Sequence, residues 1–273
     1  MAVRKIAIVP TLFTLANAVC GFAAIAYASK IGKPDASTLD DNFFLALSGW
    51  LIVAAMIFDA LDGSVARWSK SASNFGGELD SLCDVVSFGA APAFLLLRLG
   101  PGWEPNPLLH QALAGIATLY MVCAILRLAR FNVEYSPDAA SHKRFRGLPS
   151  PAAAGCIASL AILRGHLDRW PGLESLTGLV QVWAMVGALI IAMLMVSRVS
   201  YPHVVKQVFR GRRHFNHLMQ VLLAGFVIVL LQELALALIF WSYALGILAR
   251  YVWVEAVRRH ALREPGLDEV VHR

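Results

Sequence analysis

Long apolar runs separated by short polar segments constrain the fold of this chain more than any other feature of its sequence. A helix needs about 20 apolar residues to cross the hydrocarbon core of a bilayer. Eight runs approach or exceed that length, near residues 11–30, 43–67, 80–98, 110–131, 150–165, 175–197, 216–231 and 234–256. The pattern predicts an all-α polytopic membrane protein with about eight transmembrane helices.

The composition agrees with a membrane location. Hydrophobic residues make up 58% of the chain and charged residues only 15%, which is too apolar for an ordinary soluble domain. The four cysteines are isolated within apolar runs, so we interpret them as small hydrophobic residues rather than as disulfide partners or metal ligands.

The distribution of lysine and arginine predicts the orientation in the membrane. With an even number of spans both termini lie on one side, and nineteen of the 24 basic residues fall on that side. The other five are Lys30, Lys33, Arg98, Arg164 and Arg169. Because cytoplasmic loops carry the excess of basic residues, both termini are predicted to be cytoplasmic. This topology and anionic lipid headgroups explain the net charge of +6, and no motif indicates a nucleic-acid partner.

Four aspartates interrupt the apolar pattern where the second run ends and the third begins. Asp59 and Asp62 share one face of a helix, and Asp80 and Asp84 lie one turn apart on the next helix. A charged residue inside a membrane costs at least about 2.5 kcal/mol and is rarely kept without a use. Two helices that meet at their ends could therefore bring four carboxylates into one polar site.

Carboxylate oxygens are suitable ligands for hard divalent cations such as Mg²⁺ or Mn²⁺. Four carboxylates could hold two ions, as in two-metal phosphoryl-transfer sites. Gly63 and Ala66 lie on the same helix face as Asp59 and leave it open to a ligand, and Arg67 could meet a phosphate. The alternative interpretation of any single aspartate is a solvated helix end.

The same stretch resembles the CDP-alcohol phosphotransferase superfamily. Its signature, D-x₂-D-G-x₂-A-R-x₈-G-x₃-D-x₃-D, is matched at every position by Asp59, Asp62, Gly63, Ala66, Arg67, Gly76, Asp80 and Asp84. The segments 10–22, 76–93, 127–133 and 145–155 further resemble the bacterial integral-membrane CDP-diacylglycerol–serine O-phosphatidyltransferases. The resemblance covers roughly residues 5 to 200.

This resemblance implies a domain organisation and a cellular location. Residues 1–200 would form a six-helix membrane core, 201–260 a C-terminal pair of transmembrane helices, and 261–273 a cytoplasmic tail. The protein would lie in the bacterial inner membrane with its active site facing the cytoplasm. A homodimer is expected because dimers are common in the family.

The resemblance also implies the chemistry. The phosphatidyl group of CDP-diacylglycerol would pass to the hydroxyl of L-serine by direct displacement of CMP, assisted by two divalent cations. Asp59, Asp62 and Asp80 would ligate metal, and Asp84 would both ligate metal and act as the general base. The residues expected to accommodate the CDP moiety are Gly63, Ala66, Arg67 and Gly76.

The acceptor site is predicted at Arg127, Arg130 and Asn132, where an arginine would hold the carboxylate of serine. The alternative is ordinary basic flanking of a membrane span. Residues 147–155 are interpreted as a re-entrant turn near the acceptor, in preference to a helix start broken by proline. Thr14 and Asn17 either border the nucleotide or form interhelical hydrogen bonds.

Two other functions compete with this interpretation. A related enzyme could use another acceptor, such as glycerol 3-phosphate, an inositol phosphate or choline. A cation transporter could also carry carboxylates inside the membrane. All four aspartates lie near one predicted membrane face, however, and nothing in residues 110–256 repeats the 59–84 pattern. Both observations disfavour a transporter.

Overall fold

The structure is a bundle of helices whose lengths fit a membrane. The computed structural model describes residues 8–32, 40–68, 74–100, 107–134, 147–167, 172, 176–197, 199 and 233–254, and none of these residues lies in a strand. Within these ranges, six helical stretches are long and apolar enough to cross a bilayer: Val9–Ala28, Asp41–Val65, Phe75–Leu99, Pro107–Val133, Leu176–Val196 and Glu233–Val254. The prediction of an all-α membrane protein is confirmed.

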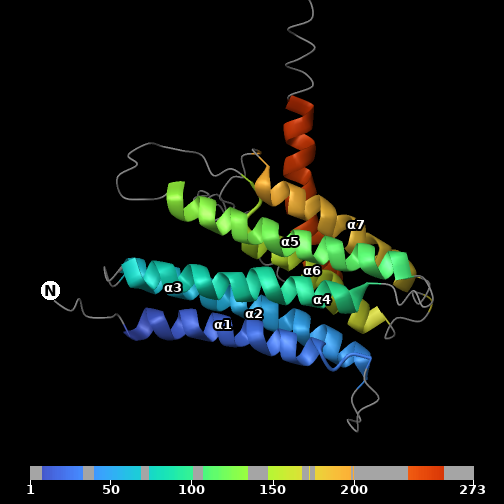
Figure 1. Cartoon of the computed structure of the whole chain (residues 1–273), viewed down its shortest axis with the longest axis horizontal. Helices are drawn as coiled ribbons and strands as arrows, with labels where there is room; N and C mark the ends of the chain where they lie inside the picture. The colour runs from blue at the N-terminus through green and yellow to red at the C-terminus, as the bar shows by residue number, and fades with distance from the viewer. Residues whose placement is uncertain are drawn as a thin grey trace, which may run out of the picture.

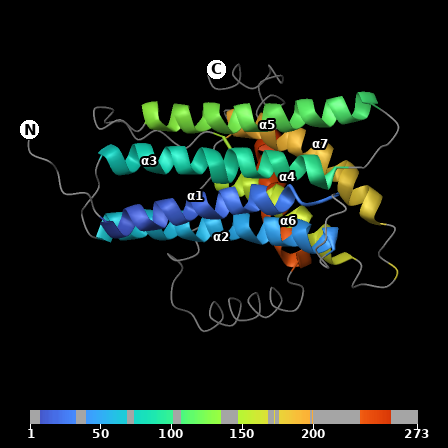
Figure 2. The ribbon, with the colours of Figure 1, turned by 60° about the horizontal axis from the view of Figure 1, so that its bottom comes forward.

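The elements follow the chain as α1 (Ile8–Ala28), α2 (Asp41–Trp68), α3 (Asn74–Asp84), η1 (Val85–Ala90), α4 (Ala91–Leu99), α5 (Pro107–Glu134), α6 (Ser150–His166) and α7 (Leu176–Val196). A further helix, Glu233–Val254, is called the C-terminal helix below. Figures 1 and 2 show α3 and α4 lying between α5 on one side and α1 and α2 on the other. The predicted seventh span, 216–231, lies outside the described residues.

The third predicted span is one rod made of α3, η1 and α4, and its middle is a π-helical turn. Such turns widen a helix locally and occur frequently at functional sites. Two side chains from neighbouring helices meet this turn. The hydroxyl of Ser87 donates to the carbonyl of Asn17 on α1 at 2.9 Å, and the hydroxyl of Tyr120 on α5 donates to the carbonyl of Phe88 at 3.1 Å. The turn is therefore fixed from both sides.

Helix α6 is enclosed by the other helices. It has 17 residues, many of them small, and an unbroken stretch from Ala153 to Ile162 is buried. On α2, a Cβ added at Gly49 would lie 2.7 Å from the side chain of Ile162 and 2.8 Å from the carbonyl of Ala158. Small residues let helix backbones approach closely in membranes. Close packing of this kind sets the position of α6 against α2.

The start of α6 is attached to the end of α7. Gly147 has φ +86°, a left-handed conformation that favours glycine, and its N–H donates to the carbonyl of Val199 at 2.7 Å. The N–H of Leu148 donates to the carbonyl of Leu194 at 3.1 Å. Because α6 begins at Ser150, the expectation of a re-entrant turn over 147–155 is wrong. Proline in the first helical turn loses no intrahelical hydrogen bond, so the segment reads as a proline-containing helix start.

The C-terminal helix packs on α6 and α7. The indole N–H of Trp241 donates to the carbonyl of Cys156 at 3.2 Å, and its ring lies 5.1 Å from that of Trp183 on α7. Phe240 fills the space beside Gly155, where an added Cβ would collide with its ring. In Figure 1 this helix, drawn in red, crosses the direction of α1 to α5 steeply.

Candidate functional site

Three of the four signature aspartates converge at one end of the bundle. Asp59 and Asp62 come from the second half of α2, and Asp80 comes from α3. One carboxylate oxygen from each lies within 4.8 Å of the other two. Asp62 is only 5% exposed, and its Oδ2 and the Oδ1 of Asp80 are buried without a hydrogen-bond partner. The helical spacing read from the sequence thus produces a compact acidic cluster.

The donor set of this cluster fits a divalent cation. Three carboxylates held this close repel one another, and a buried polar atom without a partner costs roughly 1–3 kcal/mol. A hard cation satisfies both the charge and the unpartnered oxygens, because Mg²⁺, Mn²⁺ and Ca²⁺ all prefer oxygen ligands. Within the described residues the group consists of carboxylates alone, which favours these hard cations over Zn²⁺, whose protein sites usually include histidine or cysteine.

Asp84 lies beside the cluster without belonging to its closest group. It is 8% exposed, and its Oδ1 accepts a hydrogen bond of 3.0 Å from the amide Nδ2 of Asn17. Its carboxylate is within electrostatic range of the other three aspartates. Asp84 is therefore held by a direct bond from α1.

Helix α1 contributes polar side chains to this end of the bundle. Asn17 is fully buried, and the hydroxyl of Thr14, one turn earlier, donates to the carbonyl of Pro10 in the same helix at 3.1 Å. For Asn17 the structure supports the interpretation of interhelical hydrogen bonding, whereas the bond of Thr14 lies within α1. The sequence signal was a polar pair at spacing i, i+3 within an apolar run, but its partners could not be read from that spacing.

The residues expected to accommodate CDP follow the aspartates along the two helices. Gly63 on α2 and Gly76 on α3 are partly exposed next to the cluster. Ala66 and Arg67 belong to the last turn of α2, but their side chains lie outside the described part of the chain.

The three predicted acceptor residues do not share one environment. The Nη1 of Arg127 donates to the hydroxyl of Ser150 on α6 at 2.6 Å, inside the bundle. Asn132 is exposed, and its Nδ2 donates to the hydroxyl of Ser81 on α3 at 2.9 Å. Five residues rotate a helix by about 140°, so these two side chains point in different directions. Arg130, which lies between these two residues in the sequence, is half-buried. Neither Ser81 nor Ser150 stood out in the sequence.

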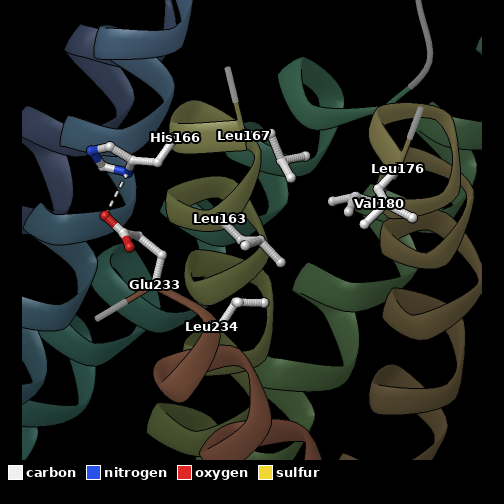
Figure 3. Close-up of a pocket in the computed structure, with 7 residues that line it drawn as sticks. All are labelled: Leu163, His166, Leu167, Leu176, Val180, Glu233 and Leu234. Carbon is white, nitrogen blue, oxygen red and sulfur yellow. Dashed lines mark ion pairs between the residues drawn. The ribbon is translucent and has the colours of Figure 1, made fainter. Parts of the chain in front are cut away.

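A small cavity lies at the opposite end of the bundle. Figure 3 shows its lining residues, which come from the ends of α6, α7 and the C-terminal helix: Leu163, His166, Leu167, Leu176, Val180, Glu233 and Leu234. The Nδ1 of His166 is 3.6 Å from a carboxylate oxygen of Glu233. The length of α6, about 24 Å, separates His166 from Ser150. This apolar cavity is not part of the acidic site.

Comparisons with known proteins agree with this geometry. The sequence model of the CDP-alcohol phosphatidyltransferase family matches residues 7–201. Among curated relatives, CDP-diacylglycerol–serine O-phosphatidyltransferase of Helicobacter pylori is 32% identical over 74% of this chain and 75% of its own. The Methanocaldococcus jannaschii protein of the same name is 32% identical over 76% of this chain and 80% of its own. That of Bacillus subtilis is 30% identical over 71% of this chain and 90% of its own.

Proposed function

This chain belongs to the CDP-alcohol phosphatidyltransferase family, and we propose that it transfers the phosphatidyl group of CDP-diacylglycerol to L-serine, giving phosphatidylserine and CMP. The observation that carries the proposal is the convergence of Asp59, Asp62 and Asp80 from two helices of an apolar bundle. The choice of serine rests on the activity for which the relatives are named and on the segments that flank the signature.

We propose two divalent cations, Mg²⁺ or Mn²⁺, with Asp59, Asp62, Asp80 and Asp84 as the residues that would hold them. When bound, such ions neutralise the charge of the pyrophosphate and of the leaving CMP. The buried, unpartnered oxygens of Asp62 and Asp80 support this assignment.

Asp84 is proposed as the general base. It takes the proton from the serine hydroxyl as the hydroxyl oxygen forms its bond to the phosphorus that carries diacylglycerol. The bond from that phosphorus to the oxygen of CMP breaks, and CMP leaves with the electron pair. A base must be held within reach of the proton it removes, and the bond from Asn17 fixes one oxygen of Asp84.

The remaining roles follow the signature and the end of α5. Gly63, Ala66, Arg67 and Gly76 are proposed to accommodate the CDP moiety, since small residues leave the helix face open and Arg67 supplies charge. Arg127, Arg130 and Asn132 are proposed as acceptor-binding residues because they end α5 at the level of the aspartates.

We also propose eight transmembrane helices, cytoplasmic termini and a site that faces the cytoplasm at the bacterial inner membrane. The core would be 1–200, the C-terminal helix pair 201–260 and the tail 261–273. Lys30, Arg98 and Arg164 lie at helix ends remote from the aspartates, which supports the orientation. Labelling of single cysteines introduced at positions 3 and 270 with an impermeant reagent tests this orientation.

A homodimer is proposed from the family resemblance, and cross-linking in membranes tests the proposed dimer.

The function is tested on purified protein in detergent with CDP-diacylglycerol and Mg²⁺ or Mn²⁺. CMP release is measured separately with L-serine, glycerol 3-phosphate, inositol, inositol phosphate and choline. Release with serine alone, lost in Asp84→Asn and kept in Asp41→Asn at the remote end of α2, is the expected result. Release with a different alcohol would refute serine as the acceptor. If the protein binds metal but releases no CMP with any acceptor, the interpretation as a cation transporter would be favoured instead.

A further inference from the structure

The structure distinguishes Arg127 from Asn132, another of the candidate acceptor residues. Arg127 lies on the face of α5 that points into the bundle. Tyr120 lies seven residues earlier on this face and Ala124 three residues earlier, and both are fully buried. The guanidinium lies within electrostatic range of Asp84. Asn132, by contrast, is exposed and bonded to Ser81. Arg127 is therefore a cationic side chain from α5 that points into the bundle within electrostatic range of the proposed base.

Ser150 holds this guanidinium from the start of α6. Ser150 is fully buried, and its hydroxyl accepts the 2.6 Å bond from Nη1 of Arg127. The backbone just before it cannot shift freely, because Gly147 and Leu148 are bonded to the end of α7. An added Cβ at Gly147 would lie 2.3 Å from the carbonyl of Met195, so the two segments are in direct contact. Ser150 is thus a fixed acceptor on a rigid part of the bundle.

The bond to Ser150 leaves one edge of the guanidinium for another ligand. Arginine binds a carboxylate with two parallel hydrogen bonds, and its Nε–Nη2 edge is one of those that can do so. Nη1, the atom bonded to Ser150, lies off that edge. The Nε of Arg127 is buried and has no hydrogen-bond partner. A buried N–H of a cation that lacks a partner in the protein fits an anionic ligand group.

We propose that Ser150 is a positioning residue that orients Arg127 to bind the carboxylate of the acceptor. This inference rests on the proposed function. The acceptor class is then an alcohol that bears a carboxylate, and the hydroxyl of that acceptor is presented to Asp84. The competing explanation is that Arg127 serves only as a counter-charge for Asp84. In that case loss of Ser150 would change turnover with every acceptor alike.

The test compares L-serine with L-serinamide, which keeps the hydroxyl and the amine but replaces the carboxylate by a neutral amide. CMP release is measured with Ser150→Ala and, as matched control, with Ser159→Ala. Ser159 is also fully buried on α6, but its hydroxyl donates to the carbonyl of Cys156 in its own helix. A third variant, Arg127→Lys, keeps the positive charge but removes the planar guanidinium and its paired N–H donors. It provides the test if Ser150→Ala does not fold.

In the unaltered protein, KM is expected to be lower for L-serine than for L-serinamide. Ser150→Ala is expected to raise KM for L-serine by about tenfold, the effect of misplacing a charge-assisted hydrogen bond, and to leave KM for L-serinamide and for CDP-diacylglycerol unchanged. Arg127→Lys should show the same pattern and Ser159→Ala none of it. Equal changes for both acceptors, or no change for either, would overturn the inference. If the unaltered protein releases no CMP with serine, the proposed function itself fails.

Discussion

Replacing Asn17 with alanine probes the link between α1 and the proposed general base. The Nδ2 of Asn17 donates to Oδ1 of Asp84 at 3.0 Å, and both residues are buried. Water has little access to take over the lost bond. The backbone carbonyl of Asn17, which accepts from Ser87, is kept in the variant, so the contact between α1 and η1 remains.

The expected size of the effect follows from the charge of the acceptor. A hydrogen bond to a charged group contributes about 1.5–3 kcal/mol. A factor of ten in rate corresponds to about 1.4 kcal/mol of activation free energy. If the orientation of Asp84 matters in the transition state, kcat should fall by roughly 10- to 150-fold. KM for CDP-diacylglycerol should change little, because Asn17 contacts the base and not one of the residues proposed for the nucleotide.

The assay is CMP release at saturating serine, together with thermal unfolding in detergent. The matched control is Asn42→Ala at the opposite end of α2, where the amide oxygen accepts a 3.0 Å bond from Nη1 of Arg164. That variant loses this bond and the 3.3 Å bond from its own Nδ2 to the carboxylate of Asp40, so it should lower the unfolding temperature at least as much as Asn17→Ala and keep kcat. An Asn17→Ala protein that is folded and turns over at the unaltered rate would refute the role assigned to this bond.

Two further predictions concern the metal site and the packing of α6. Asp80→Asn should abolish CMP release and weaken binding of Mn²⁺, measured by calorimetry, whereas Asp41→Asn should bind it normally; equal Mn²⁺ binding by both would contradict the ligand assignment. Gly49→Leu should destabilise the bundle by about 1–3 kcal/mol because α6 occupies the space that the new side chain needs. Gly115→Leu, at a position with open space, should not lower the unfolding temperature, and equal melting of both variants would argue against tight contact between α2 and α6.

The sequence predicted what depends on local spacing. Hydropathy located the described helices, since a membrane span must be apolar over most of its length. The three-residue step from Asp59 to Asp62 placed both carboxylates on one face, because helical geometry is the same in every fold. Asp80 joined them because a short connection brings the start of α3 near the end of α2.

What the sequence did not reveal depends on contacts between distant segments. The bond from Asn17 to Asp84 joins residues 67 apart, and that from Arg127 to Ser150 joins residues 23 apart. Neither partner can be inferred from periodicity, because many helix arrangements bury the same faces. The different environments of Arg127 and Asn132 could not be predicted for the same reason. Their spacing predicts that the two side chains point in different directions, but not which of them points into the bundle.

The burial of α6 connects the packing of the bundle to its proposed chemistry. Both ends of this helix and its middle are attached to different neighbours: Gly147, just before it, to α7, Cys156 to Trp241, and Arg164 to α2. Ser150 therefore has a defined position relative to α5, and it bonds the guanidinium of Arg127, which lies within electrostatic range of Asp84. The C-terminal helix lies beyond the residues matched by the family model, yet through Trp241 it braces the helix that carries Ser150. The C-terminal helix thus contributes to the position of Ser150 through its contact with α6.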